Sequence, residues 1–420
     1  MKILCLSNGH GEDAIALRIL QALQRQPNSP DLAALPLVGE GLAYQRAGIP
    51  LAGAVKAMPS GGFIYMDSHQ FIRDVGGGLL QLTLGQIRTV RQWARLGYRI
   101  LAVGDIVPLL FAWMSGADYA FVGTAKSEYY LRDENGWLPR PSWFERLEGW
   151  SGSVYLPWER WLMGHSRCQV VFPRDAFTAR ILQRWAIPTF DLGNPMMDGL
   201  EPTGHLQLPP ADPVHPSLNL LLLPGSRAPE AYANWRLILQ AVASVRERFQ
   251  GRSLRYLAAI APSLDLMPLQ QALHAAQWQS REGTSCWRQA EDPVQLFVAD
   301  GATLVLTQSG FGDCLHHADV AIALAGTATE QVVGLGKPVV TFPGPGPQFT
   351  PAFAEAQTRL LGPSIVPVDH PQQAGEAIAS LLNDPERLQR IEQNGRSRLG
   401  LPGAGDRIAR CLLRRFRLSS

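Results

Sequence analysis

The 420-residue chain is long enough for two globular domains, since a single domain usually holds about 100 to 200 residues. Apolar residues make up 46% of the sequence and charged residues 18%, so two hydrophobic cores can form. A formal net charge of +2 does not indicate a nucleic-acid-binding protein. Five scattered cysteines fit a reducing compartment rather than a disulfide framework or a zinc site.

The sequence contains no recognisable signal peptide or membrane-spanning segment. Residues 1–7 are a short apolar run without the basic flank and the longer apolar region of a signal peptide. The most apolar long window, 100–112, contains Asp105 and Pro108 and falls short of the roughly 18 to 20 residues that cross a membrane. We therefore expect a cytoplasmic protein that at most makes peripheral contact with a membrane.

The first predicted unit is a strand at 3–6 and a helix at 14–23, joined by the polar loop 8–13 of sequence NGHGED. His10 in this loop has three interpretations: a residue without function, a substrate contact, or a general base. Its unperturbed pKa suits proton transfer near neutral pH. Because α/β sheets bind ligands at the carboxyl ends of their strands, the position of His10 favours the functional interpretations.

A second predicted strand, 100–105, ends in an acidic residue, Asp105. A carboxylate at that edge of the sheet faces the expected ligand site. The structural alternative is that Asp105 caps the helix expected over 108–114.

Three segments carry side chains that suit a lipid. Apolar residues in the expected loops at 58–86 suit a lipid or polyprenyl acceptor, or they pack onto their own domain. Residues 137–161 hold five of the eleven tryptophans, which can lie at a membrane interface, stack on sugar rings or form a local core. The basic amphipathic helix expected at 406–418 can lie on anionic lipid or pack back onto the first domain.

Closely spaced prolines between residues 195 and 216 predict an extended linker, so we place the first domain at 1–200 and the second at 217–400. In the second domain, apolar strands are predicted at 254–260 and 303–306. The latter leads into the turn Ser309-Gly310.

Two further strands of the second domain end in glycine turns. The strand 220–223 enters PGSR, in which Arg227 can hold an anion bidentately, and the strand 320–324 enters a turn at Gly326. A glycine turn before a helix N-terminus offers N–H groups and a partial positive charge to a phosphate. Only a parallel sheet would bring these turns, about one hundred residues apart, to one edge.

The helix after Gly326 begins with Thr327-x-x-Glu330, a pattern with two interpretations. As a capping box, the Thr327 hydroxyl caps the helix and the Glu330 carboxylate bonds back to the Thr327 N–H. As a ligand contact, Glu330 binds a substrate hydroxyl instead. Gly336 and Pro338 are expected to end this helix.

Three motifs resemble those of lipid-A-disaccharide synthase: LPGSR at 223–227, GTATEQ at 326–331 and LGNPMMD at 192–198. The loop 8–13 resembles the Gly-rich, acidic N-terminal loop of that family. The resemblance implies an α/β protein of the GT-B type, in which two Rossmann-like domains with parallel sheets face each other across a cleft. It further implies that residues 1–200 take the acceptor, that 217–400 hold the nucleotide-sugar, and that the C-terminal helix 405–420 packs back onto the first domain.

The resemblance also implies roles for individual residues. A histidine in the N-terminal loop is the suspected base or acceptor contact of related GT-B enzymes, although lipid-A-disaccharide synthase has none there. That family has an Asp important for catalysis at a comparable strand end, within a longer acidic motif that is reduced here to GDIVP. His10 and Asp105 are thus the catalytic candidates. The expected substrate contacts are Gly9, Gly11, Glu12, Gly225, Ser226, Arg227, Ser309, Gly310, Gly326, Thr327, Ala328, Thr329, Glu330 and Gln348.

The expected reaction moves a sugar from a UDP-sugar, of the UDP-N-acetylglucosamine type, to a hydroxyl of a lipid or other acceptor with inversion. The sequence contains no Asp-x-Asp, the carboxylate pair with which GT-A enzymes hold a metal, so we expect a metal-independent reaction without a cofactor. One rival is a UDP-N-acetylglucosamine 2-epimerase, which needs several acidic residues around one sugar ring. The other is a nucleotide-sugar-binding protein that has lost catalysis.

Overall fold

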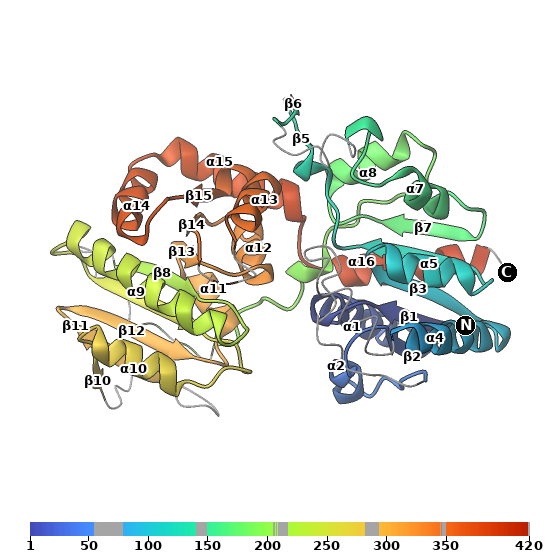
Figure 1. Cartoon of the computed structure of the whole chain (residues 1–420), viewed down its shortest axis with the longest axis horizontal. Helices are drawn as coiled ribbons and strands as arrows, with labels where there is room; N and C mark the ends of the chain where they lie inside the picture. The colour runs from blue at the N-terminus through green and yellow to red at the C-terminus, as the bar shows by residue number, and fades with distance from the viewer. Residues whose placement is uncertain are drawn as a thin grey trace. The chain divides into compact units, whose positions relative to one another are not determined.

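The computed structural model describes residues 1–53, 79–139, 149–204, 206, 208, 217–281, 294–344, 346 and 350–418. The chain divides into two units, residues 1–198 with 400–420 and residues 199–399 (Figure 1). Each unit has a central sheet between helices, the arrangement that alternating apolar strands and amphipathic helices favour. None of the described helices is long and apolar enough to cross a membrane.

Within the described residues, the first unit is built on a five-stranded parallel sheet with the order β2-β1-β3-β4-β7. Its strands are β1 (Lys2–Ser7), β2 (Asp31–Pro36), β3 (Tyr98–Gly104), β4 (Tyr119–Gly123) and β7 (Cys168–Phe172). Most of their side chains are buried, as expected of parallel strands covered on both faces. The strands expected at 3–6 and 100–105 are confirmed as β1 and β3.

Helices cover both faces of this sheet (Figure 1). They are α1 (His10–Gln24), α2 (Leu42–Arg46), α4 (Leu79–Arg95), α5 (Ile106–Met114), α7 (Pro157–Met163), α8 (Ala176–Gln183) and α16 (Ala404–Leu418), with the short turns η1 (Glu128–Tyr130) and η2 (Pro195–Met197) and the hairpin β5 (Arg132–Asp133) and β6 (Gly136–Trp137). The C-terminal helix α16 packs against α1 and β7. Of the expected loops at 58–86, residues 79–86 belong to α4, and the part before residue 79 lies outside the described residues.

In the described part of the second unit, an eight-stranded sheet has the order β10-β11-β12-β9-β8-β13-β14-β15. The strands are β8 (Leu218–Leu223), β9 (Leu254–Ala259), β10 (Gln279–Arg281), β11 (Gln295–Ala299), β12 (Ala302–Thr307), β13 (Val320–Ala323), β14 (Val339–Thr341) and β15 (Ile365–Pro367). All neighbours from β12 to β15 pair in parallel, whereas β10 and β11 extend the sheet in antiparallel fashion.

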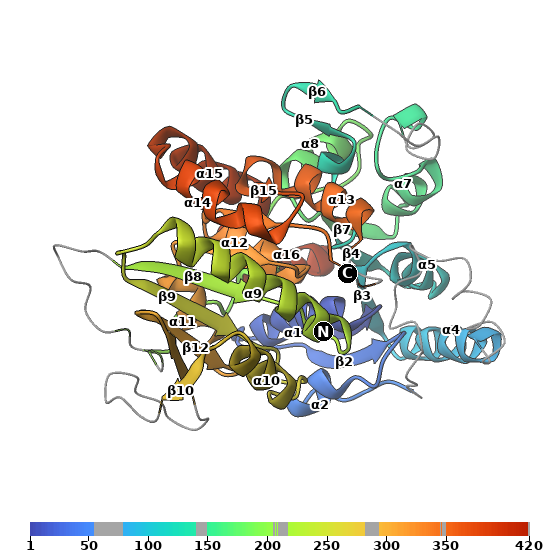
Figure 2. The same cartoon turned by 60° about the vertical axis from the view of Figure 1, so that its left-hand side comes forward.

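The helices of the second unit are α9 (Glu230–Arg248), α10 (Met267–Ala275), α11 (Phe311–His317), α12 (Thr327–Gly334), α13 (Pro351–Leu361), α14 (Ala374–Leu382) and α15 (Pro385–Leu399), with the turns η3 (Gly362–Ser364) and η4 (Pro371–Gln373). Figure 2 shows α9 lying along β8. Trp235 of α9 is fully buried in this core, and its indole N–H donates to the Leu269 carbonyl at 3.1 Å. The polar N–H of this large buried side chain therefore has a hydrogen-bond acceptor.

One local expectation for the first unit is wrong. The helix after β1 begins at His10 rather than at residue 14, because Gly9, with φ of 134°, makes the turn and the Asp13 N–H donates to the Gly9 carbonyl at 2.8 Å. The acidic pair Glu12-Asp13 therefore lies in the first helical turn, where the helix dipole favours negative charge.

Candidate functional sites at the carboxyl edges of the two sheets

The two glycine turns of the second unit lie side by side. Strands β8 and β13 are adjacent and parallel, with Leu223 opposite Ala323, so the turns that follow them share one edge of the sheet. Gly225 has φ of 102°, and a Cβ added to it would stand 3.3 Å from the Leu324 carbonyl oxygen. Only glycine combines this backbone conformation with so close an approach. The expectation that a parallel sheet joins the two turns is confirmed.

Buried amide side chains, which the sequence alone did not single out, form hydrogen bonds to these turns from the interior of the domain. The Asn234 side-chain amide of α9 donates to the carbonyls of Pro224 and Leu324, at 3.1 and 3.5 Å. The Gln357 amide of α13 donates to the Ala325 carbonyl at 3.0 Å. Since these carbonyls are held towards the interior, the backbone around the turns is fixed before any ligand binds. The available signal was a polar amide inside the apolar stripe of α9.

The N-terminus of α12 has no side-chain cap. Its N-cap is Gly326 rather than Thr327, and glycine has no side chain that could cap the helix, so the interpretation of Thr327 as the cap of a capping box is wrong. The Thr329 hydroxyl instead donates backward to the Ala325 carbonyl at 2.7 Å. The Thr329 and Glu330 N–H groups donate to the Gly326 carbonyl, at 3.0 and 3.3 Å, so the N–H groups of Thr327 and Ala328 are the ones that a ligand can use, and Glu330 is half-buried beside them.

The other expected donor-side residues lie at the same edge. Ser309 and Gly310 follow β12, and the Thr307 hydroxyl accepts both of their N–H groups, at 3.3 and 3.2 Å, which forms a tight turn. Strand β9 lies between β12 and β8, so this turn is two strands away from Gly225. Arg227 is half-buried in the loop that leads into α9. The prediction for Gln348 lies outside the described residues.

In the first unit, the loop after β1 and the end of β3 meet. The Asp13 carboxylate accepts hydrogen bonds from the hydroxyls of Ser7 and Tyr44, at 2.5 and 3.4 Å, and is almost fully buried. This carboxylate joins α1 to β1 and α2, which is a structural role. His10 is the first residue of α1, Gly9 is its N-cap and Gly11 is exposed, whereas the side chain of His10 lies outside the described part of the chain.

Asp105 is the N-cap of α5, as the structural alternative anticipated. One of its oxygens accepts the Val107 N–H at 2.8 Å, and the Asn8 side-chain amide lies 3.1 Å from both oxygens. Burial raises the pKa of Asp105 above its usual range, while these two hydrogen bonds offset part of the increase. A carboxylate fixed in this way is well oriented but has few free lone pairs.

Glu12 has the most unusual carboxylate at this edge. Burial, helped by the neighbouring charges of Asp105 and Asp13, raises the pKa of Glu12 to about 7. The space beside it exists because residue 104 is glycine with φ of 136°. A Cβ there would stand 3.3 Å from the Glu12 Cγ and 3.6 Å from the Asn8 Cβ. A group that exchanges its proton near pH 7 suits acid–base chemistry better than simple substrate contact.

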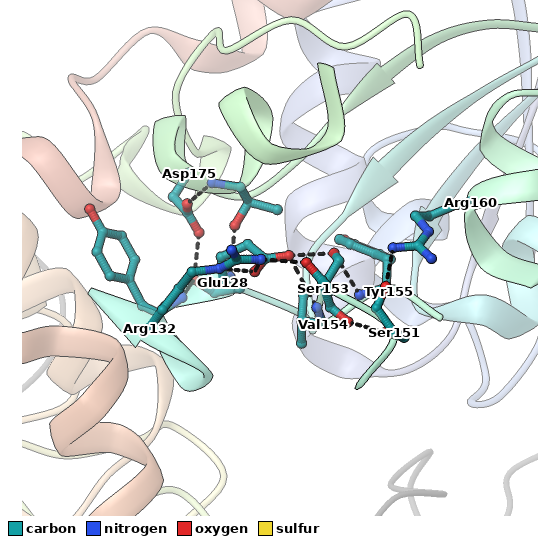
Figure 3. A network of polar contacts seen from close by, with 12 residues as sticks. Glu128, Arg132, Ser151, Ser153, Val154, Tyr155, Arg160 and Asp175 are labelled. Carbon is teal, nitrogen blue, oxygen red and sulfur yellow. Dashed lines mark hydrogen bonds and ion pairs between the residues drawn. The ribbon is translucent and has the colours of Figure 1, made fainter. Parts of the chain in front are cut away.

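A buried polar network follows β4 and β7 in the same unit (Figure 3). The Glu128 carboxylate is fully buried and accepts hydrogen bonds from the Ser153 hydroxyl, the Val154 N–H at 3.0 Å and the Arg132 guanidinium at 2.8 Å. Asp175 accepts from the Ser127 hydroxyl at 2.7 Å and caps α8. The network fixes the irregular segment between β4 and α7.

This network explains why the local-core interpretation of the tryptophans is wrong. The described tryptophans of segment 137–161 are all more than half exposed, whereas Ser153 and Val154 of that segment are buried and donate to the Glu128 carboxylate. These tryptophans are Trp137, Trp150, Trp158 and Trp161. Among the described residues, no group of three or more His, Cys, Asp or Glu side chains is placed to hold a metal ion.

The fold defines the class of protein: this is an α/β protein with parallel sheets in two Rossmann-like domains, as in GT-B glycosyltransferases and UDP-GlcNAc 2-epimerases. The calicheamicin glycosyltransferase CalG4 matches with a TM-score of 0.59 and 15% identity, over 99% of this chain and 98% of its own. MurG of Acinetobacter baumannii matches with a TM-score of 0.54 and 13% identity, over 98% and 99%. The UDP-GlcNAc 2-epimerase of Neisseria meningitidis, bound to UDP-GlcNAc, matches with a TM-score of 0.52 and 16% identity, over 99% and 100%.

One sequence relative gives a more particular likeness. The lipid-A-disaccharide synthase of Geobacter sulfurreducens is 25% identical over 206 residues, which are 49% of this chain and 44% of the relative. The match thus spans less than half of the relative's length. No protein-family model matches the chain.

Proposed function

We propose that this protein is a glycosyltransferase that moves a sugar from a UDP-sugar, of the UDP-N-acetylglucosamine type, to a hydroxyl of a lipid or other acceptor with inversion. The observation that carries the proposal is the pair of adjoining turns at Gly225 and Gly326, beside the uncapped N-terminus of α12. A nucleoside diphosphate matches such a site because its phosphates accept N–H hydrogen bonds at a helix N-terminus. The likeness to a UDP-GlcNAc-bound epimerase and to a named glycosyltransferase supports it.

The donor-side groups act on the leaving diphosphate. As the acceptor oxygen bonds to the anomeric carbon, the bond from that carbon to the diphosphate oxygen breaks, and negative charge grows on the diphosphate. The first-turn N–H groups of α12 and the Arg227 guanidinium stabilise this negative charge in our proposal. One preorganised donor of this kind is worth about 3 to 4 kcal/mol of transition-state stabilisation. We further assign Gly225 and Ser226 to contacts with the phosphates, and residues 327–330 to contacts with the phosphates and the ribose. Ser309 and Gly310 are assigned to the nucleobase, and Gln348 is assigned to the transferred sugar.

The proton of the acceptor hydroxyl goes to a base of the first unit, for which His10, Asp105 and Glu12 are the candidates. Asp105 is held by Asn8 and the Val107 N–H, so its geometry suits orientation of the acceptor. Glu12, with a pKa raised to about 7, is the carboxylate that exchanges a proton most readily at neutral pH. Gly9 and Gly11 are assigned to contacts with the acceptor, and a Cβ added to Gly11 would meet nothing within 4 Å.

An epimerase remains the second candidate because the structure brings Asp105 close to the sequence-adjacent carboxylates Glu12 and Asp13. Glu12, Asp13 and Asp105 lie near one another at the edge of the first sheet. Asp13 and Asp105 are engaged in structural hydrogen bonds, however, which leaves only Glu12 for exchange with a sugar. The third candidate is a protein that binds the nucleotide-sugar without turning it over.

Product analysis distinguishes these functions. The protein is incubated with sugar-labelled UDP-N-acetylglucosamine and a bacterial lipid extract, and the label is followed by chromatography and mass spectrometry. A glycosylated lipid together with free UDP is the expected product. A labelled UDP-sugar of changed configuration would establish the epimerase instead, and unchanged donor that nevertheless binds would leave only the binding protein.

A lipid acceptor implies that the protein works at the cytoplasmic face of a membrane. Exposed indoles favour peripheral contact, since tryptophan is enriched at the interface between lipid and water. Co-sedimentation with vesicles of the same lipid extract tests this contact. Loss of sedimentation when Trp158 and Trp161 are both changed to Ser would assign the contact to α7, and sedimentation equal to the wild type would exclude that helix.

A further inference from the structure

The amino edge of the first sheet carries a groove that the proposed reaction does not use. The groove has a volume of about 530 Å³ and is lined by residues 26–28 after α1 and by Arg410, Leu413, Arg414 and Arg417 of α16, with Leu418 at its end. An adjoining hollow of about 430 Å³ shares Asn28, Leu413 and Arg417 with it and continues to Lys2 and Arg99. We call the two together the basic groove.

The basic groove lies at the opposite end of the strands from the candidate site. Lys2 is the first residue of β1, whereas the acidic edge with Glu12 follows the last residue of that strand. Six residues of extended strand span about 20 Å, so the two places cannot share one small ligand. Figures 1 and 2 show the C-terminal part of α16 beside the start of β1.

Five cations converge on the basic groove from three elements of the fold. Arg410, Arg414 and Arg417 follow one another at helical spacing along one side of α16, and all three are exposed. Lys2 comes from β1 and Arg99 from β3. Among the described residues that line the groove, none is acidic.

Three acids lie near these cations but do not line the groove. The carboxylate of Asp406, one turn before Arg410, is paired with Arg25 at 3.1 Å. Asp31 stands opposite Lys2 in the strand register, and the Asp118 carbonyl accepts the N–H of Ile100, the residue after Arg99. The Lys2 ammonium donates to the Leu96 carbonyl at 3.4 Å, and the Arg99 guanidinium lies 5.4 Å from the centre of the Phe416 ring, so both are held in place beside the groove. The C-terminal dipole of α16 favours cations only in its last turn, so it does not account for Arg410.

We propose that the basic groove binds a phosphate-bearing anion. Guanidinium groups match the oxygens of a phosphate bidentately, and several cations around a small cavity lower their mutual repulsion when a multiply charged anion enters. The apolar lining from Leu413 and Pro27 suits an anion with an apolar part. The phosphate can belong to a free metabolite or to a lipid headgroup, and both present the same chemistry to the arginines.

The test uses pyrophosphate as the free probe and phosphatidylcholine vesicles with and without phosphatidylglycerol as the lipid probe. Binding of pyrophosphate is measured by titration calorimetry, and binding of vesicles by co-sedimentation. Three variants of the full chain are compared with the wild type. R414E/R417E reverses two charges of the basic groove, R387E/R390E makes the same change at the same spacing on α15, and Arg227→Ala alters the proposed donor site.

The proposal expects probe binding that persists in Arg227→Ala, in which the proposed donor site is altered, and that R414E/R417E weakens roughly tenfold or more while R387E/R390E keeps it. If R414E/R417E loses binding of pyrophosphate, the ligand is a free anion. If this variant loses binding only of the phosphatidylglycerol vesicles, the ligand is a lipid headgroup. Absence of binding of either probe to the wild type would overturn the proposal. So would pyrophosphate binding that disappears only in Arg227→Ala, since it would belong to the second unit. Melting temperatures and the uncharged variant R414Q/R417Q separate lost binding from lost folding. Because the proposal does not depend on sugar transfer, its failure and that of the proposed function are distinguishable.

Discussion

Three carboxylates at the carboxyl edge of the first sheet differ only in their surroundings. Asp13 is tied to Ser7 and Tyr44, and Asp105 to Asn8 and the first turn of α5. Glu12 is half-buried near both of them, and its pKa rises to about 7. Side chains of similar chemistry thus divide into two that hold the edge together and one that can exchange a proton at neutral pH.

The raised pKa of Glu12 predicts a pH dependence of stability. A carboxyl group whose pKa is higher in the folded protein favours folding below its unfolded value of 4.5, and this contribution is lost as the pH rises through about 7. We expect Glu12→Gln to be more stable than the wild type at pH 8, by about 1 to 3 kcal/mol, and to lose that advantage near pH 4.5. Urea unfolding at both pH values measures it, with the exposed Glu40→Gln as control. A difference that does not change with pH would contradict the burial of Glu12.

The capping box proposed for Glu330 requires Thr327 as the N-cap of α12, and the N-cap is Gly326 instead. As a ribose contact, Glu330→Gln should lower UDP affinity by roughly tenfold, because a hydroxyl donates more strongly to a carboxylate than to an amide. Its melting temperature should stay that of the wild type. Thr327→Ala should also melt like the wild type, because Thr327 is the first helical residue and not the cap. UDP affinity unchanged in Glu330→Gln would remove this residue from the site.

Among the elements, α16 shows how a distant part of the chain is bound into the first unit. The Asp198 carboxylate accepts the N–H groups of Gly403, Ala404 and Gly405, at 2.6, 3.0 and 2.7 Å. A Cβ on Gly405 would stand 3.3 Å from the Arg18 carbonyl oxygen, so glycine lets α16 lie close to α1. The motif LGNPMMD thus includes the cap of a helix about two hundred residues further along the chain.

Removal of this cap should loosen α16 selectively. We expect Asp198→Ala to cost about 1 to 2 kcal/mol, since three N–H groups lose their acceptor. Hydrogen exchange followed by mass spectrometry should show faster exchange in α16 and unchanged exchange in α9 of the second unit. Asp191→Ala, a change of the same type in the exposed loop before the motif, is the control. Equal exchange in α16 of both variants would show that the cap contributes nothing.

At the scale of the whole molecule, the two Rossmann-like domains could be predicted because their signals are local. Apolar strands such as 220–223 and 320–324, each followed by a glycine turn and a helix, indicate parallel sheets without further information. Gly336, with φ of 79°, follows α12 as the sequence predicts. These features depend on residues within one strand–turn–helix unit.

The features that could not be predicted depend on contacts between distant segments. Thr327 reads as a helix cap, yet Gly326 takes that place, and the Thr329 hydroxyl bonds to a carbonyl of the preceding strand end. Asn234 supports two turns that are a hundred residues apart; its place in the apolar stripe of α9 marks the amide as buried but does not identify those turns. The exposure of the tryptophans has the same kind of cause, because Ser153 of their segment is buried against Glu128, which lies outside the segment and also binds Arg132.

The most direct test of the central claim is the affinity for UDP, measured by titration calorimetry on the wild type, Arg227→Ala and Arg252→Ala. Arg227 lies in the turn after β8 at the proposed diphosphate site, whereas Arg252 lies in the loop before β9, at the opposite end of the sheet. The account predicts that the wild type binds UDP, that Arg227→Ala binds it roughly tenfold or more weakly, and that Arg252→Ala binds it like the wild type. Equal affinities in all three proteins, or no binding of UDP to a folded wild type, would contradict the account.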